Sequence, residues 1–165
     1  MRFNEKPTCA YGLGAFFVSC CSQPYTTLII VDTTPFPHPT AAFRTESKQK
    51  LVAAIDDCFK ISIDGDCSEG PRGPIGQWDV KGVTKMDEIF SFCTAFNQDL
   101  SQWDVSAVTT MKSVFIGAES FNQDLSKWDV SAVVNMNSMF YGASAFNQDL
   151  SKWDVSGVTD MGYMF

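Results

Sequence analysis

The second half of the chain repeats one pattern of apolar and polar positions at a fixed interval. Its tryptophans are the clearest marker, and consecutive ones are 25 residues apart: Trp78, Trp103, Trp128 and Trp153. Asp and Val follow each tryptophan, and further Val, Met and Phe residues return at constant offsets. The string FNQDLS recurs unchanged at 96–101, 121–126 and 146–151, so no insertion or deletion breaks the register. Self-similarity at a fixed period is typical of repeat architectures.

A unit of this size cannot bury a core alone, so its apolar columns must pack against those of neighbouring units. Stacked units of this kind form a quasi-one-dimensional solenoid, and the period lies within the range of leucine-rich repeats. The sequence therefore predicts an α/β solenoid, a leucine-rich-repeat-like stack of 25-residue coils with a short strand plus a short helix in each coil. Four units cover residues 71–165, and the last is incomplete.

The spacing inside a unit indicates which part is helix and which is strand. Val108, Met111 and Phe115 follow the spacing of one helical face. Ser106 stands where an N-cap residue is expected, and Gly117 where a C′ glycine is expected. The other half of the unit, residues 100–105, places Leu, Trp and Val between polar residues and predicts a short strand.

Residues 43–70 do not follow the repeat and predict an N-terminal helical cap. Their apolar residues share one helical face: Leu51, Val52, Ile55, Cys58 and Phe59. A cap of this kind covers the apolar end that a solenoid otherwise exposes. Cys58 and Cys67 are close enough in sequence to form a disulfide that holds the cap to its following loop. Cys93 stands in a column of alanines and predicts a small buried thiol.

The N-terminal region has a composition of its own. Residues 7–31 carry no charge, and we interpret 1–23 as a signal or an anchor segment, with membrane anchoring through 7–31 as one alternative. Glu5, Gln23 and Pro24 weaken both interpretations, so a segment that is neither stays open. The Pro/Thr-rich stretch 24–42 predicts a semi-rigid linker.

Net charge and histidine content exclude several classes of function. Twelve basic against 19 acidic residues give a formal charge of −7, which argues against a nucleic-acid partner. The single histidine, His38, lies in the proline-bearing stretch PFPHPT, so the chain lacks the usual base of hydrolytic triads. We expect no cofactor, no catalytic residue and no metal site.

Three columns of the repeat call for a structural interpretation first. The tryptophans are expected to form a buried ladder rather than an exposed strip for sugars or bases. A buried asparagine ladder of Asn97, Asn122 and Asn147 would satisfy backbone groups at the turns. The aspartates after each Trp are expected to accept backbone N–H bonds at their corners. The alternative is that they hold calcium between coils together with Asp99, Asp124 and Asp149.

The repeat WDVS-x-V-x-x-M-x-x-[MV]-F resembles that of the BspA-like leucine-rich-repeat surface-protein family, as in FNQDLSKWDVSAVVNMNSMF at 121–140. The resemblance covers about 43–165 and includes the preceding helix and the segment GPIGQWDV. It implies a secreted or surface-anchored repeat protein, treated as an adhesin or protein binder, without catalytic residues.

The leading hypothesis is a noncatalytic secreted or cell-surface protein that mediates protein–protein interaction or adhesion. Its binding residues are expected at positions that differ between units or stand beside the tryptophans: Lys85, Lys112, Asn137, Tyr141, Lys127 and Lys152. The alternatives are a structural or calcium-stabilised surface spacer and a polysaccharide-acting solenoid enzyme. Apolar residues of the last, uncovered coil predict self-association there.

Overall fold

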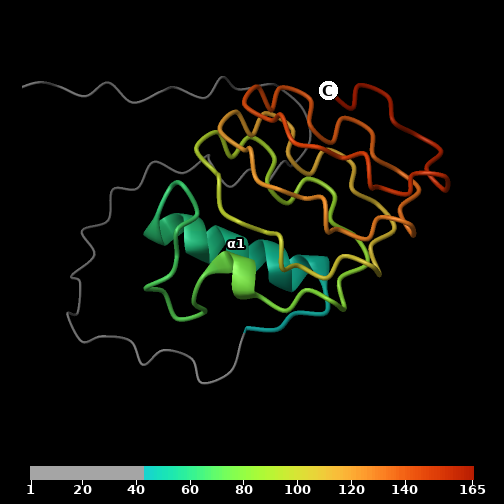
Figure 1. Ribbon diagram of the computed structural model, residues 1–165. Coiled ribbons are helices and arrows are strands. Elements are labelled where there is room, and N and C mark those ends of the chain that lie inside the picture. The colour runs from blue at the N-terminus through green and yellow to red at the C-terminus, as the bar shows by residue number, and fades with distance from the viewer. Residues whose placement is uncertain (1–42) are drawn as a thin grey trace, which may run out of the picture.

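The computed structural model describes residues 43–165 (Figure 1). The expected signal or anchor segment 1–23, the uncharged stretch 7–31, the linker 24–42 and His38 lie outside the described residues. The described part contains one α-helix, α1 (Lys48–Ile61), and one 3₁₀ helix, η1 (Ile75–Gln77). Turns and isolated bridges make up most of the rest.

Helix α1 forms where the sequence predicts the cap. Ser47 begins it, because its side chain accepts a hydrogen bond from the backbone N–H of Lys50 at 3.3 Å. The helix buries one apolar face: Leu51, Ala54, Ile55, Cys58 and Phe59. Phe59 contacts Phe96 of the repeat region, with ring centroids 5.9 Å apart. The cap therefore packs against the apolar interior of the first repeat turns (Figure 1).

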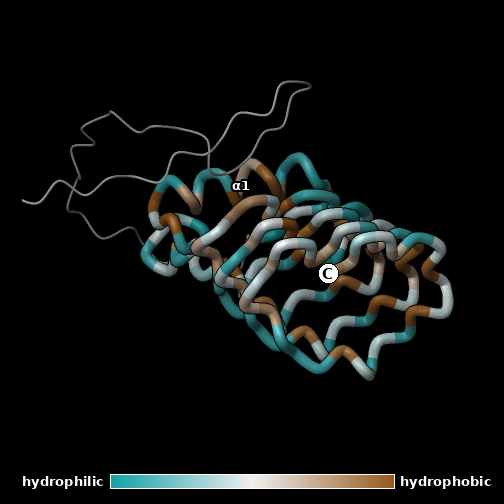
Figure 2. Tube along the Cα trace, turned by 90° about the horizontal axis from the view of Figure 1, so that it is seen from above, coloured by the Kyte–Doolittle hydropathy of each residue, from teal (hydrophilic) through white to brown (hydrophobic). Residues whose placement is uncertain are grey.

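Successive 25-residue turns lie beside one another and share backbone hydrogen bonds. The N–H of Met86 donates to the carbonyl of Thr110 at 3.0 Å, and the N–H of Thr109 donates back to Thr84 at 2.8 Å. The same contacts recur one turn later, and a row of isolated parallel bridges follows the stack: Lys85, Thr110, Asn135 and Asp160. Figure 2 shows these turns following one another away from α1.

The predicted short helix is not present in these turns. Between Met111 and Ala118 the chain makes three successive four-residue turns. The N–H groups of Val114, Ile116 and Ala118 close them by donating to the carbonyls of Met111, Ser113 and Phe115. Ser113 (φ 55°) and Gly117 (φ 65°) have positive φ angles, which interrupt a right-handed helix. Intervening N–H groups, such as that of Ser113, donate instead to the next turn, here to Asn137 at 2.9 Å. Val108, Met111 and Phe115 have the spacing of a helical face because successive turns, like a helix, point every third or fourth side chain into the core.

The predicted short strand over 100–105 is also absent, and the described residues contain isolated bridges instead of strands. Trp103 closes a turn on Leu100, with its N–H 3.0 Å from that carbonyl. This bond uses an amide that a strand would have offered to its neighbour. The corner is a tight reversal that directs the tryptophan inward.

Two columns of phenylalanine fill the interior beside the tryptophans. Within a turn, Phe115 stacks on Phe121 with centroids 4.0 Å apart, and the pairs in the flanking turns repeat this contact. Between turns, Phe115 stacks on Phe90 and Phe140 at 5.6 Å. Phe90, Phe115 and Phe121 have no solvent exposure. The core is thus a continuous aromatic stack along the row of turns, made of residues that a single turn could not bury.

Candidate functional site

The four tryptophans line the core and hold each turn to the one before it. Trp78, Trp103 and Trp128 are 3% exposed, and Trp153 is 8% exposed. Each indole N–H of the later turns donates to a carbonyl of the preceding turn: Trp103 to Ile75 at 2.9 Å, Trp128 to Leu100 and Trp153 to Leu125 at 3.0 Å. Trp78 donates instead to Gly73 of its own unit, at 3.1 Å. These indoles are structural and offer no face to a ligand.

The asparagine column also links neighbouring turns, but it lies at the surface. Asn97, Asn122 and Asn147 are exposed, which corrects the expectation of a buried ladder. Asn97 Oδ1 accepts the backbone N–H of Asn122 at 2.9 Å, and the Gln123 amide donates to the same oxygen at 2.9 Å. The asparagine oxygen takes the place of a backbone acceptor at the corner. Asparagine is therefore useful at this position even though its side chain is exposed to water.

The aspartates after the tryptophans close turns at the corners. Oδ1 of Asp104 accepts both the hydroxyl of Ser106 at 2.6 Å and its backbone N–H at 3.1 Å. Asp129 repeats both bonds with Ser131, and Asp154 accepts the N–H of Ser156. The hydroxyl of Ser131 is the largest cause that lowers the pKa of Asp129, followed by its N–H, and both outweigh the neighbouring carboxylates Asp104 and Asp154.

These bonds offset the repulsion within the column, and salt bridges add to them at Asp104, 3.7 Å from Lys81, and at Asp79, 3.5 Å from Arg44. Asp99, Asp124 and Asp149 make the same bond to the N–H two residues on. Residues 43–165 contain no group of three or more His, Cys, Asp or Glu side chains that could hold a metal ion.

The predicted binding residues fall on two separate segments of the turn. Lys85, Lys112, Asn137 and Tyr141 belong to the bridged segments 85–92, 110–117 and 135–142, which we call the variable ridge. Lys85, Lys112 and Tyr141 are exposed and Asn137 is half-buried. Lys127 and Lys152 are exposed on the other corner, directly before their tryptophans. The structure thus joins four of the six candidates on one ridge and leaves the two lysines elsewhere.

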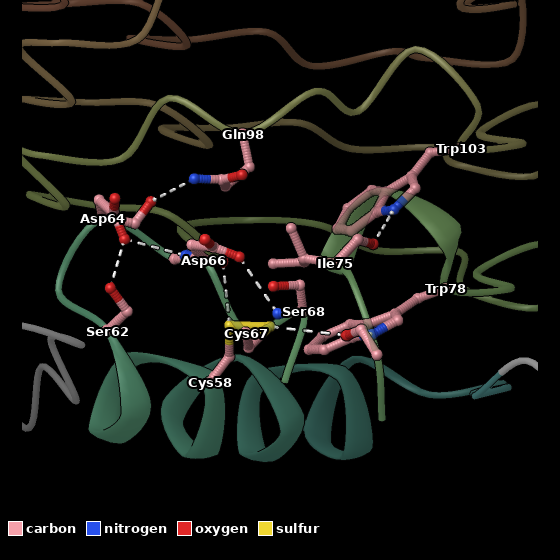
Figure 3. Close-up of a disulfide and its surroundings, with 12 residues drawn as sticks. Cys58, Ser62, Asp64, Asp66, Cys67, Ser68, Ile75, Trp78, Gln98 and Trp103 are labelled. Carbon is pink, nitrogen blue, oxygen red and sulfur yellow. Dashed lines mark hydrogen bonds between the residues drawn. A yellow bond between two sulfur atoms is a disulfide. The ribbon is translucent and has the colours of Figure 1, made fainter. Parts of the chain in front are cut away.

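The cap is closed by a disulfide between Cys58 of α1 and Cys67 of the following loop (Figure 3). The carbonyl of Asp64 in this loop accepts the side-chain amide of Gln98 at 3.2 Å. Cys93 is buried, with a thiol contact to the carbonyl of Ser91. The disulfide therefore fixes the loop that meets the first full repeat corner.

Two features of the structure go beyond what the sequence predicts. One is the indole N–H bond between turns, for which the fixed Trp–Leu spacing was the available signal. The other is a groove between the cap loop and the first corners, lined by Asp66, Gln77 and Asp99 among others. No sequence pattern indicated the groove, because it depends on how closely Gly76 approaches Asp99.

Residues 54–165 match the family described as Mycoplasma protein of unknown function, DUF285. The chain belongs to this family. No curated protein sequence and no solved structure matches it. Among residues 43–165, no helix has the length and apolar character needed to cross a membrane.

Proposed function

We propose that this DUF285 chain is a noncatalytic repeat protein that is displayed outside the cell and binds other proteins through its variable ridge. The observation that carries the proposal is the division between constant and varying positions. The constant columns are committed to packing or to turn hydrogen bonds, as Trp128 and Asp129 illustrate. The varying residues of the ridge, such as Lys112 and Tyr141, face solvent and change from turn to turn.

The fold assigned to this protein is part of the proposal. Turns joined by backbone bonds, with aromatic columns inside, support a leucine-rich-repeat-like solenoid in which paired turns replace the helix. The resemblance of the repeat to BspA-like surface proteins supports display on the cell or secretion from it. The Cys58–Cys67 disulfide supports the same location, because such bonds persist in oxidising environments.

The enzyme alternative has less support from the geometry. Catalytic sites break the symmetry of a repeat, whereas the carboxylates here perform the same turn-closing role in every unit. A purely structural spacer would also use regular columns, but it gives no reason for exposed side chains such as Tyr141 to differ between turns.

The test is capture of extracellular proteins on the immobilised full chain, followed by substitution of the ridge. We expect Lys112→Ala with Tyr141→Ala to reduce capture of a specific protein by about tenfold or more, because exposed aromatic and cationic residues dominate many interfaces. Lys127→Ala with Lys152→Ala is the matched control, since it removes two exposed side chains from the other corner. Equal capture by both double variants would contradict the ridge, and the absence of specific capture would contradict the binding function.

A further inference from the structure

The turn at residues 146–165 leaves one of its surfaces uncovered. This turn lies at the end of the row opposite α1 (Figure 1). In the preceding turn Phe140 is 2% exposed, whereas Phe165, at the same place one turn later, is 71% exposed. We call the uncovered surface the open face, and it exposes four large apolar side chains: Val155, Met161, Tyr163 and Phe165. The open face is the surface by which each inner turn contacts the next one.

The backbone of the open face directs a row of N–H groups outward. In the preceding turn the corresponding N–H groups donate to the next turn, each at 2.8 Å: Met136 to Asp160, Ser138 to Gly162 and Phe140 to Met164. One turn later, these N–H groups make no backbone hydrogen bond within residues 43–165: Met161, Tyr163 and Phe165. An edge with such unpaired groups is a template for pairing with another chain.

The open face also carries acceptors at its corners. In the preceding turn, Asn122 Oδ1 accepts the N–H of Asn147 at 2.9 Å, and the carbonyl of Leu125 accepts the indole of Trp153 at 3.0 Å. The equivalent acceptors of the open face, Asn147 Oδ1 and the carbonyl of Leu150, receive no such bond within the described part of the chain. A partner therefore has to supply carbonyls to one segment of this face and donors to the corners.

A folded second copy of the chain does not supply this arrangement. If it turns the same segment toward the open face, N–H groups meet N–H groups and no hydrogen bond forms. The complementary side of its first turn is covered by its own cap. There the N–H of Asp79 donates to the carbonyl of Phe43 at 2.8 Å, and Lys48 Nζ lies 4.0 Å from a carboxylate oxygen of Asp87.

We propose that the open face binds an uncapped repeat turn of the same spacing from another protein molecule. The carbonyls of that turn accept the outward N–H groups, and its tryptophan donates to the carbonyl of Leu150. Its phenylalanine stacks on Phe165, as Phe165 itself stacks on Phe140 with centroids 5.7 Å apart. The contact continues the interface that joins every inner pair of turns. It is separate from the variable ridge, so the inference does not depend on the proposed function.

The test is an NMR titration of the isotope-labelled full chain with a synthetic peptide of residues 121–145, FNQDLSKWDVSAVVNMNSMFYGASA, blocked at both ends. We expect saturable shifts and slower hydrogen exchange of the backbone amides of Met161, Tyr163 and Phe165. The control peptide has the same residues in reverse order, which keeps its composition but not its arrangement, and it should leave these amides unchanged. Equal response to both peptides, or no response to the first at about 1 mM, would overturn the proposal.

Substitutions locate the contact on both partners. Phe165→Ala in the chain is expected to weaken peptide binding about tenfold, because it removes the ring on which the peptide stacks. Ile63→Ala, which removes an exposed apolar side chain of the cap loop, is the matched control and should bind as the parent does. Trp128→Ala in the peptide should weaken binding tenfold or more, to about the level of the reversed peptide. Equal losses in the Phe165→Ala and Ile63→Ala chains would contradict the assignment.

The self-association that the sequence predicts is the alternative occupant, and sedimentation of the chain without peptide tests it. We expect a monomer, with signals of the three outward amides that do not depend on protein concentration. Association that shifts these amides would show that a second copy binds the open face, and it would overturn the proposal. Shifts of the same size with sodium acetate at equal ionic strength would also overturn it, because they would show a general anion site.

Discussion

Helix α1 and the repeat turns satisfy their backbone amides in opposite ways. In α1 the donors and acceptors belong to one segment, and Ser47 and Ser62 complete its two ends. In the turns, every second N–H from Met86 to Phe92 donates to the next turn. The helix therefore needs no neighbour for its backbone hydrogen bonds, whereas a single repeat turn leaves about half of its donors without an acceptor when the next turn is absent.

The difference predicts where stability comes from in each region. The cap has backbone bonds within α1 and the Cys58–Cys67 disulfide, in addition to the apolar face that it buries against the turns. The turns depend on contacts between units, so their stability is a sum of interface terms along the row.

Removing one indole from the middle of the row is expected to have the largest effect. Trp128→Ala should lower the free energy of unfolding by about 3–5 kcal/mol, because it opens a cavity and removes the bond to Leu100. Urea denaturation followed by circular dichroism measures this loss. Lys112→Ala, on the ridge, should change the free energy of unfolding by less than about 0.5 kcal/mol. Similar losses in both variants would show that the inside and outside are wrongly assigned.

Replacing both cysteines of the disulfide by alanine is expected to weaken the cap selectively. The disulfide joins residues nine positions apart. Its loss should lower the free energy of unfolding by about 2–3 kcal/mol, because the unfolded chain gains conformational entropy. Hydrogen exchange should show lost protection in α1 first, while amides of the turns after residue 110 keep theirs. Uniform loss of protection in both regions would instead show that the cap and the turns unfold as one unit.

Ser113→Gly distinguishes turns from helix by the sign of its effect. Ser113 has a φ angle of 55°, so glycine should stabilise the protein by about 0.5–1 kcal/mol by relieving a left-handed conformation. In a helix the same change would destabilise by about 0.5 kcal/mol. The shift in the thermal unfolding midpoint gives the sign. Ala107→Gly, at an exposed position with no positive φ recorded, is the control and should not stabilise.

The smallest expected effect is a pH dependence at the corners. The pKa of Asp129 is lowered from 3.8 by its hydrogen bonds, so the unfolded chain takes up the proton first as the pH falls. The contribution is present above pH about 4 and is lost as the pH drops through the lowered value. Ser131→Ala should raise the pKa of Asp129 toward 3.8, which NMR of its carboxyl carbon measures. An unchanged pKa would show that the hydroxyl of Ser131 is not its cause.

The columns of the repeat were predictable from the sequence because burial requires apolar side chains at a fixed interval. The local conformation was not, since Val108, Met111 and Phe115 have the same spacing in a helix and in consecutive turns. Gly117 did indicate a positive φ, but Ser113 carries no such signal, and without it a helix ending at Gly117 was the simpler interpretation. The groove could not be derived, because it depends on how closely Gly76 approaches Asp99.

The hydrogen bond from each indole to the preceding turn is the same at every interface, and this has a consequence for adding or removing repeat units. The indole N–H of each turn donates to the equivalent carbonyl of the preceding turn, as Trp128 does to Leu100 and Trp153 to Leu125. A duplication or deletion of one whole unit by recombination within the gene would join matching surfaces. Gain or loss of a whole unit would therefore leave the contacts between the remaining turns unchanged.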